Sequence, residues 1–234
     1  MIIWRLYMIK VLIFDLDDTL ISESDYVFSG YHAVSEYLSQ KHSLDKIKLY
    51  NNMVNLFKQS PKNLFNRLLE ENDILYTSDD IKQLVQVYRE HKPSIFLKEH
   101  TLDILNELKH QGYKLGIITD GFSITQHNKL KVLPFENLFD NIIVTDDLGR
   151  DYWKPHPLSF EKQKEFFNVS FEEMAYIGDN PAKDFYIKRH YPLCTIRLLE
   201  DGVHSNNPYL EELKEDYTIQ SIKDLPELLN DINK

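Results

Sequence analysis

The amino-acid sequence predicts an α/β protein in which a parallel β-sheet is interrupted, after its first strand, by an inserted helical subdomain. Five short apolar runs have the length and composition of buried strands. After the first run, from about Ser22 to His91, apolar residues recur every three or four positions, which is typical of helices, and further helices are expected between the later runs. Strands that alternate with helices form parallel βαβ units with right-handed crossovers. A chain of 234 residues is long enough for one such domain with an insertion.

The first strand is expected at Lys10–Phe14, which reads Lys-Val-Leu-Ile-Phe and is followed by an aspartate. The run Met1–Ile13 is mostly apolar and is therefore also a candidate targeting segment. However, Arg5 and Lys10 interrupt it, it contains no small-residue cleavage site, and it is too short to span a bilayer. We therefore expect a core strand preceded by a short leader, and no interaction with a membrane.

The insertion has helical periodicity and no strand signals. Ser60 followed by Pro61 predicts the N-cap and the first residue of one of its helices. Ser78, followed by two aspartates, predicts the N-cap of another helix. Lys92-Pro93 marks the end of the insertion. The predicted organisation is a helical subdomain at residues 22–92 and a core formed by residues 1–21 and 93–234.

Strands and helices alternate after the insertion. The expected order is a helix at Thr101–Gln111 ended by Gly112, a strand at Lys114–Thr119, a helix from Gly121 to about Leu133, a strand at Asn141–Thr145, a helix at Pro157–Phe167, and strands at Met174–Gly178 and Cys194–Leu198. The acidic, turn-rich segment Glu200–Asp216 is expected to be a surface loop. A short terminal helix follows, with an apolar face that contains Leu225, Leu228, Leu229 and Ile232.

The net charge and the number of cysteines indicate which binding partners and which cellular compartment suit this protein. The net charge of −10 argues against binding to a nucleic-acid polymer, because such proteins carry a basic face. A small phosphorylated substrate remains compatible, because a metal ion and a lysine can reverse the local field. Cys194 is the only cysteine, so the chain has no internal disulfide and a cytoplasmic location is expected.

Two carboxylates come directly after the first predicted strand. Asp15 and Asp17 are two residues apart, so their side chains face the same side of an extended segment. Two close carboxylates repel each other, which raises the pKa of one of them unless a cation stabilises both charges. Mg²⁺ binds such oxygen ligands together with waters and a phosphate. One carboxylate could then attack phosphorus while the other transfers a proton. Alternatively, Asp17 and Asp18 only form a turn.

Further polar groups follow the later strands. Thr119-Asp120-Gly121 combines a hydroxyl with backbone N–H groups at a helix start, which can bind phosphate, although an N-cap has the same sequence. Lys154 could neutralise a phosphoryl group, or be a surface residue. Asp179 and Asp184 add two carboxylates near the fourth strand, or belong to a capped helix start. The carboxyl ends of parallel strands meet at one edge of a sheet, so these groups predict a single site.

These motifs resemble those of the haloacid dehalogenase superfamily, in which hhhhDxDxT, hhhT, a lysine and GDxxxxD occur in the same order. The similarity covers about Lys10 to Leu198 and implies a Rossmann-like three-layer core. The insertion at 22–92 resembles the helical cap of members that carry an insert after the first motif. Two positions depart from the usual pattern. Asp120 replaces a commoner asparagine or glycine, and residues 185–192 are bulky where small residues are usual.

The resemblance implies roles for the residues that would carry out the reaction. Asp15 would be the nucleophile that forms an aspartyl-phosphate. Asp17 would be the general acid that protonates the leaving oxygen and then activates water. The Thr119 hydroxyl and the backbone at Asp120 and Gly121 would hold the phosphoryl oxygens. Lys154 would balance their charge and orient Asp15.

The resemblance also implies a Mg²⁺ site. The carboxylates of Asp15 and Asp179 and the carbonyl of Asp17 would bind the ion. Asn180 would assist the metal site through a water, and Asp184 would lie in the second layer around the metal or near Lys154.

We therefore expect a Mg²⁺-dependent phosphatase that hydrolyses a small metabolite, either a nucleoside monophosphate or a sugar phosphate. The acid at position 17 favours phosphoester hydrolysis, since dehalogenase-type and phosphonatase-type members differ there. A phosphomutase with the same aspartyl-phosphate and a non-catalytic binding protein are the alternatives. A scaffold, however, has no reason to keep Asp15, Asp17, Lys154 and Asp179 together. Either a monomer or a homodimer is expected.

Overall fold

The computed structural model describes residues 8–200, 202, 204 and 206–234, so the first seven residues of the predicted leader lie outside the described residues. The chain divides into two compact units. One consists of the residues up to Glu23, Phe96–Gln126 and Leu133–Lys234. The other consists of Ser24–Ile95 and His127–Val132.

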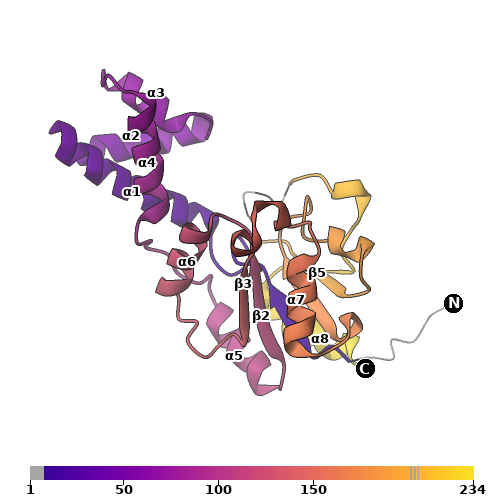
Figure 1. Ribbon diagram of the computed structural model, residues 1–234. Helices are drawn as coiled ribbons and strands as arrows, with labels where there is room; N and C mark the ends of the chain where they lie inside the picture. Colours follow the sequence, from indigo (N-terminus) through magenta and orange to yellow (C-terminus); the bar gives the residue numbers. More distant parts are fainter. Residues whose placement is uncertain (1–7, 201, 203, 205) are drawn as a thin grey trace. The chain divides into compact units, whose positions relative to one another are not determined.

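The first unit is built on a parallel sheet with the strand order β3-β2-β1-β4-β5-β6 (Figure 1). The strands are β1 at Val11–Phe14, β2 at Lys114–Thr119, β3 at Asn141–Val144, β4 at Met174–Gly178, β5 at Cys194–Leu198 and β6 at Tyr217–Ile219. β1 lies between β2 and β4, and Val11 is paired with Lys114 on one side and Met174 on the other. β1 and β4 are buried along their whole length, which explains their continuous apolar sequences.

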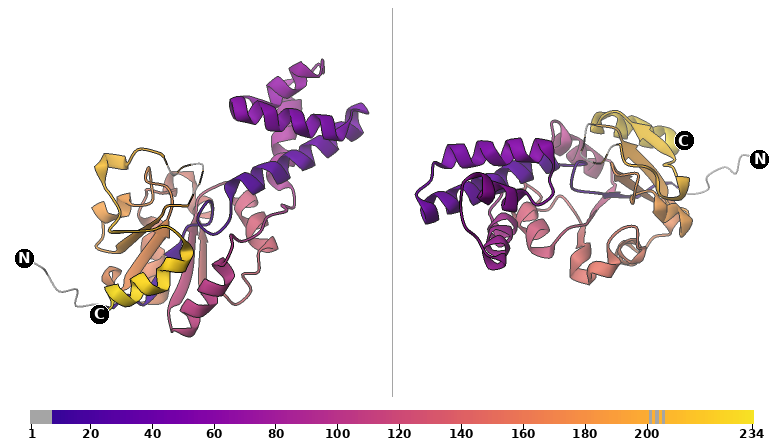
Figure 2. Two further views of the ribbon diagram at one scale, coloured as in Figure 1. Left: turned by 180° about the vertical axis from the view of Figure 1, so that it is seen from behind. Right: turned by 90° about the horizontal axis from the view of Figure 1, so that it is seen from above.

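Helices cover both faces of this sheet. They are α5 at Thr101–His110, α7 at Leu158–Phe167 and α8 at Leu225–Ile232, while α6 at Ser123–Val132 follows β2 and is divided between the two units. α7 lies in front of the sheet in Figure 1, whereas the reverse view in Figure 2 shows α5 and α8 on the opposite face. On the α7 face, Phe160 packs against Tyr176 of β4. The predicted Rossmann-like three-layer α/β fold is therefore confirmed.

Short 3₁₀ turns fill several connections: Thr145–Leu148, Arg150–Tyr152, Phe171–Glu173, Tyr186–Arg189, Leu210–Glu212 and Ile222–Asp224. One of them shortens a predicted strand, because β3 ends at Val144 and Thr145 begins the first turn. The helix expected from Gly121 begins at Ser123 instead. The sequence also gave no indication of β6, whose first two residues are exposed.

The second unit contains four helices, α1 at Glu23–His42, α2 at Lys46–Gln59, α3 at Leu64–Glu71 and α4 at Ser78–Glu90. Their buried faces form a separate apolar core that includes Val34, Met53, Leu68 and Leu84. The second half of α6 belongs to this unit, and Asn128 donates to the Glu90 carbonyl at the end of α4. Among the described residues, none of the helices has both the length and the apolar character needed to cross a bilayer.

Two predicted helix starts in this unit are wrong. Ser60 is the C-cap of α2, and its N–H donates to the Leu56 carbonyl, whereas α3 begins only at Leu64. Ser60 and Pro61 therefore belong to the connection between α2 and α3. The N-cap of α4 is Thr77 rather than Ser78, because the Thr77 hydroxyl accepts from the Asp80 N–H while the Asp80 carboxylate accepts from the Thr77 N–H.

Candidate active site

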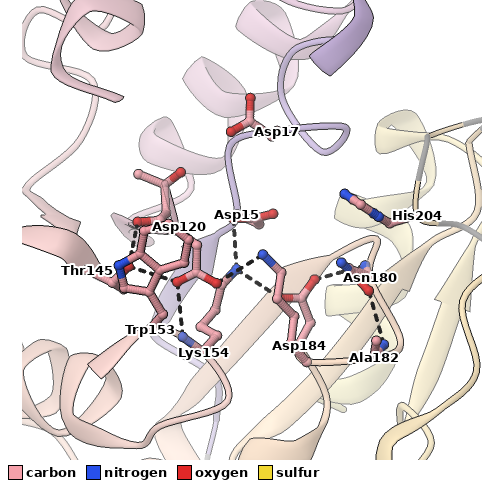
Figure 3. A network of polar contacts seen from close by, with 12 residues as sticks. Asp15, Asp17, Asp120, Thr145, Trp153, Lys154, Asn180, Ala182, Asp184 and His204 are labelled. Atoms are coloured by element: carbon pink, nitrogen blue, oxygen red, sulfur yellow. Dashed lines mark hydrogen bonds and ion pairs between the residues drawn. The ribbon is translucent and has the colours of Figure 1, made fainter. Parts of the chain in front are cut away.

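A buried ion pair lies at the carboxyl ends of the central strands of the sheet. Asp15 follows β1 directly and is 4% exposed. Its Oδ1 accepts a hydrogen bond of 2.8 Å from the ammonium group of Lys154. Figure 3 shows the two side chains pointing toward each other. The structure thus brings together two residues that the sequence separates by 139 positions.

Lys154 is held by three oxygen atoms. Besides Asp15, its Nζ donates to Asp184 Oδ1 at 2.8 Å and to the Tyr176 hydroxyl at 2.6 Å. Burial by itself lowers the pKa of the ammonium group, but the neighbouring carboxylates of Asp15 and Asp184 outweigh this effect and raise the pKa well above its usual value. Lys154 is therefore a fixed positive charge beside Asp15.

Three carboxylates form an acidic cluster at the same place. Ligand atoms of Asp15, Asp179 and Asp184 lie within 4.8 Å of one another, and all three residues are buried. Burial, followed by the charges of Asp184 and Asp15, raises the pKa of Asp179 to about 8. Burial and the Asp184 charge raise the pKa of Asp15 to about 6, despite the opposing effect of Lys154. The ammonium of Lys154 therefore does not offset the repulsion among the three carboxylates.

The acidic cluster fits a divalent cation. Asp179 Oδ2 is buried and has no hydrogen-bond partner among the described residues. A buried polar atom without a partner is unfavourable unless something else satisfies it. Carboxylate oxygens are the ligands that Mg²⁺ prefers, and a cation would relieve the repulsion that raises these pKa values.

The Asp184 carboxylate lies close to the backbone of Gly178, the last residue of β4. Its Oδ2 accepts from the Asn180 N–H at 2.9 Å, while its Oδ1 faces Lys154. A Cβ atom at Gly178 would lie 2.5 Å from Asp184 Oδ2, so a side chain at this position is incompatible with the observed geometry. The side chain of Asn180 accepts from the N–H of Ala182 and from Asn207. Asn180 therefore holds the loop after Asp179.

The proposed phosphate-binding residues lie at the end of β2. The Thr119 side chain is buried, and its Oγ1 accepts a hydrogen bond of 2.5 Å from Gln126 Nε2. The same amide donates to Asp17 Oδ2 at 2.9 Å. The backbone at Gly121 has φ +140°. The Gln126 side chain thus links Thr119 to Asp17, two residues that the sequence predicted to lie in the same site.

The carboxylate of Asp120 connects several loops of the site. It accepts from the Thr145 hydroxyl at 2.8 Å, from the Lys154 N–H at 3.0 Å and from the Lys183 ammonium at 3.0 Å. Burial opposes ionisation of this carboxyl, but Lys154 and Lys183 outweigh it and lower the pKa. The departure from the usual asparagine or glycine therefore has a structural reason, because a negative charge at this position pairs with Lys183.

Four residues of this network were not predicted from the sequence. Tyr176 was assigned only to a strand, and Thr145 only to a strand end. Gln126 and Lys183 were not considered, although Lys183 lies within the GDxxxxD motif and is a second lysine close to a site that contains several carboxylates. For Gln126, the available signal was its position one turn beyond the Thr119 motif.

Comparisons with known proteins agree with this geometry. The model of the family described as haloacid dehalogenase-like hydrolase matches residues 12–187. A glyceraldehyde 3-phosphate phosphatase of Methanocaldococcus jannaschii is 30% identical over 232 residues, which covers 97% of this chain and 100% of the relative. The pyrophosphatase PpaX of Bacillus mycoides is 26% identical over 231 residues, covering 96% and 99% of the two chains.

A solved structure supports the fold. The HAD-hydrolase YfnB of Bacillus subtilis, whose crystal structure contains magnesium, superposes with a TM-score of 0.67 at 23% identity, over 95% of this chain and 99% of that one. The chain belongs to the family of haloacid dehalogenase-like hydrolases. Within this family, the sequence relatives named above are phosphatases, and the prediction that this chain is a phosphatase is confirmed.

Proposed function

We propose that the protein is a Mg²⁺-dependent phosphomonoester hydrolase that acts on a small metabolite through an aspartyl-phosphate at Asp15. One observation carries this proposal. The Asp15 carboxylate is paired with the buried Lys154 ammonium and belongs to an acidic cluster in which Asp179 Oδ2 has no partner among the described residues. A buried nucleophile beside a fixed positive charge and a candidate cation site suits attack on a phosphate ester.

The proposed reaction proceeds in two steps. A carboxylate oxygen of Asp15 attacks phosphorus, and the bond from phosphorus to the ester oxygen breaks as the Asp17 carboxyl protonates that oxygen. Asp17 then removes a proton from water, which attacks the phosphorus of the aspartyl-phosphate and releases phosphate and Asp15. The Thr119 hydroxyl and the backbone N–H groups of Asp120 and Gly121 bind the phosphoryl oxygens. Lys154 offsets their negative charge.

The carboxylates of Asp15 and Asp179 and the carbonyl of Asp17 would hold Mg²⁺. When bound, the ion supplies positive charge that lets the acidic cluster stay ionised and draws a phosphoryl oxygen to the site. Asp184 and Asn180 position this arrangement without binding the ion, because the Asp184 side chain already pairs with Lys154 and with the Asn180 N–H.

The substrate we propose is a small phosphate ester, either a sugar phosphate of triose size or a nucleoside monophosphate. The relative at 30% identity, which is named for glyceraldehyde 3-phosphate, favours the sugar phosphate. The similarity to the pyrophosphatase PpaX makes inorganic pyrophosphate the second candidate.

We also propose that the insertion at 22–92 is a substrate-specificity cap on the core of 1–21 and 93–234, and that the enzyme is cytoplasmic.

Phosphate release from a panel of triose phosphates, nucleoside monophosphates and pyrophosphate, with Mg²⁺ or with EDTA, tests the proposal. We expect release from one class, with Mg²⁺ only. The Asp15→Asn protein should fold with an unchanged circular dichroism spectrum and lose turnover, which would exclude a binding protein. Activity undiminished by EDTA would refute the mechanism. Transfer of phosphate to a second substrate hydroxyl, rather than to water, would indicate the phosphomutase.

A further inference from the structure

A buried amide joins two residues that belong to separate motifs. Gln126 of α6 is 1% exposed, and its Nε2 donates to Asp17 Oδ2 at 2.9 Å and to Thr119 Oγ1 at 2.5 Å. We propose that Gln126 is a positioning residue that holds the Asp17 carboxyl and the Thr119 hydroxyl in the orientations used in the reaction. This inference rests on the proposed function, since it takes Asp17 as the proton donor and Thr119 as a phosphate ligand.

The chemistry of a primary amide determines the direction of both hydrogen bonds. Nε2 of Gln126 carries two N–H donors and no acceptor, so each hydrogen serves one partner. Thr119 Oγ1 accepts, and its own O–H can therefore donate to an anionic phosphoryl oxygen. Asp17 Oδ2 also accepts from the amide, so the proton that Asp17 delivers to the leaving oxygen is carried by Oδ1. A single side chain thereby sets the hydrogen-bonding roles of both groups.

The local backbone leaves room for this amide. Gly121 has φ +140°, and a Cβ atom at this position would lie 2.9 Å from the Gln126 side chain. The Gln126 N–H donates to the Phe122 carbonyl at 3.0 Å, which fixes its backbone in the first turn of α6. The glycine that follows Asp120 therefore serves Gln126 as well as the phosphate loop.

The two roles of Gln126 predict different effects on different substrates. An alkoxide is a poor leaving group and needs a proton as the bond to phosphorus breaks, whereas p-nitrophenolate leaves as a stable anion. Misplacing Asp17 therefore slows the hydrolysis of an alkyl phosphate more than that of an aryl phosphate. Misplacing Thr119 weakens phosphate binding to the same extent for both. The ratio of the two rates separates positioning of Asp17 from other effects.

The test compares the full-length wild type and Gln126→Leu, with Mg²⁺, on glyceraldehyde 3-phosphate and on p-nitrophenyl phosphate. We expect kcat for the alkyl ester to fall by about 100-fold, and for the aryl ester by less than about 10-fold. KM should rise by a similar factor for both. Gln126→Glu has nearly the same volume and, when ionised, has no donor, so it repeats the test if the leucine variant does not fold.

Gln163 provides a matched control. It is also a buried glutamine of the same unit, but its amide donates to the Ile117 carbonyl at 2.8 Å and accepts from Asn141, away from Asp17. Gln163→Leu should lower the temperature of unfolding and leave the alkyl-to-aryl ratio of kcat unchanged. If the ratio changes equally in both variants, general destabilisation explains it and the inference is wrong.

A second comparison places the effect on Asp17. In an Asp17→Asn background, Gln126→Leu should change kcat for the alkyl ester by less than about threefold, because residues that act as a unit are not additive. Equal losses on the two esters, or full additivity with Asp17→Asn, would overturn the inference. A wild type that hydrolyses neither these two esters nor any substrate of the panel above would instead refute the proposed function, and the inference with it.

Discussion

Lys154 and Asp15 form a 2.8 Å ion pair in which neither side chain is more than 5% exposed. The pair joins the loop after β3 to the end of β1. An ion pair this deeply buried is scarcely screened by solvent. Removing one partner would therefore leave the other as a buried charge without compensation. The same ammonium also bonds Asp184, so the pair is part of a network that orders three of the motifs.

Replacing the ammonium should therefore disable the site. We expect Lys154→Met to reduce kcat by about 100- to 1,000-fold, the loss typical for one group that stabilises transition-state charge. The free energy of unfolding should fall by up to about 3–5 kcal/mol, because Asp15 and Asp184 lose their buried partner. Phosphate release and urea unfolding would measure the two effects. A Lys154→Met protein with normal kcat would contradict the assigned role.

The ion pair between Asp120 and Lys183 should be energetically coupled but weaker. The Lys183 side chain is 26% exposed, so solvent partly screens its 3.0 Å contact with Asp120. We expect a double-mutant cycle of Asp120→Asn and Lys183→Met to give a coupling of about 1 kcal/mol in the free energy of unfolding. Fully additive effects in urea unfolding would show that the contact has no role in stability.

The stability of the metal-free protein should decrease as pH rises. The pKa of Asp179 is about 8 and that of Asp15 about 6 in the folded state, both above the usual 3.8. Protons are therefore bound more tightly by the folded state, and the stabilisation present at low pH is lost as pH rises through these values. Between pH 4 and pH 8 the free energy of unfolding should fall by on the order of a few kcal/mol. Urea unfolding in EDTA measures this change.

Mg²⁺ and Asp179→Asn provide the controls for that titration. At pH 8, Mg²⁺ should raise the unfolding midpoint of the wild type, since the ion binds only the folded protein. The Asp179→Asn protein should be more stable than the wild type in EDTA at pH 8, because one repelling charge is absent, and Mg²⁺ should shift its midpoint less. If Mg²⁺ raised the unfolding midpoint equally in the wild type and in the Asp179→Asn protein, the ion would bind at a site that does not include Asp179.

Gly178→Ala should damage the site through Asp184. The added methyl group would meet Asp184 Oδ2 at 2.5 Å and displace it from Lys154. We expect a loss of stability of about 1–3 kcal/mol together with a lower kcat. Gly112→Ala is the matched control, because Gly112 has φ +95° and no atom within 4 Å of an added Cβ. It should lose about 1 kcal/mol by backbone strain alone and keep its kcat.

The sequence was most informative where burial is complete. β2, β4 and β5 have the predicted limits, because most of their residues are apolar and nearly all of them are buried. β6 could not be found in this way, since Tyr217–Ile219 is a three-residue strand at the edge of the sheet with two exposed positions. The helix start at Ser60 was misplaced because a serine followed by proline occurs both in a turn and at a helix start.

The site was partly predictable for a related reason. Asp15, Asp179 and Asp184 follow recognisable strands, so topology alone places them at one edge. Gln126 has no such signal, because a polar residue in a helix resembles one on a solvent-exposed face until the strand beneath it is known. The same applies to Tyr176, whose hydroxyl touches Lys154 but whose ring is part of the core.

The central position of β1 affects how the chain folds during its synthesis. Val11 must find Lys114 and Met174, which leave the ribosome about 100 and 160 residues later. At about 5–20 residues per second, this strand waits roughly 5–20 s for its first neighbour. Throughout that interval an apolar segment with unpaired backbone groups is available to other chains, so the nascent protein is expected to need shielding by a chaperone until β2 emerges.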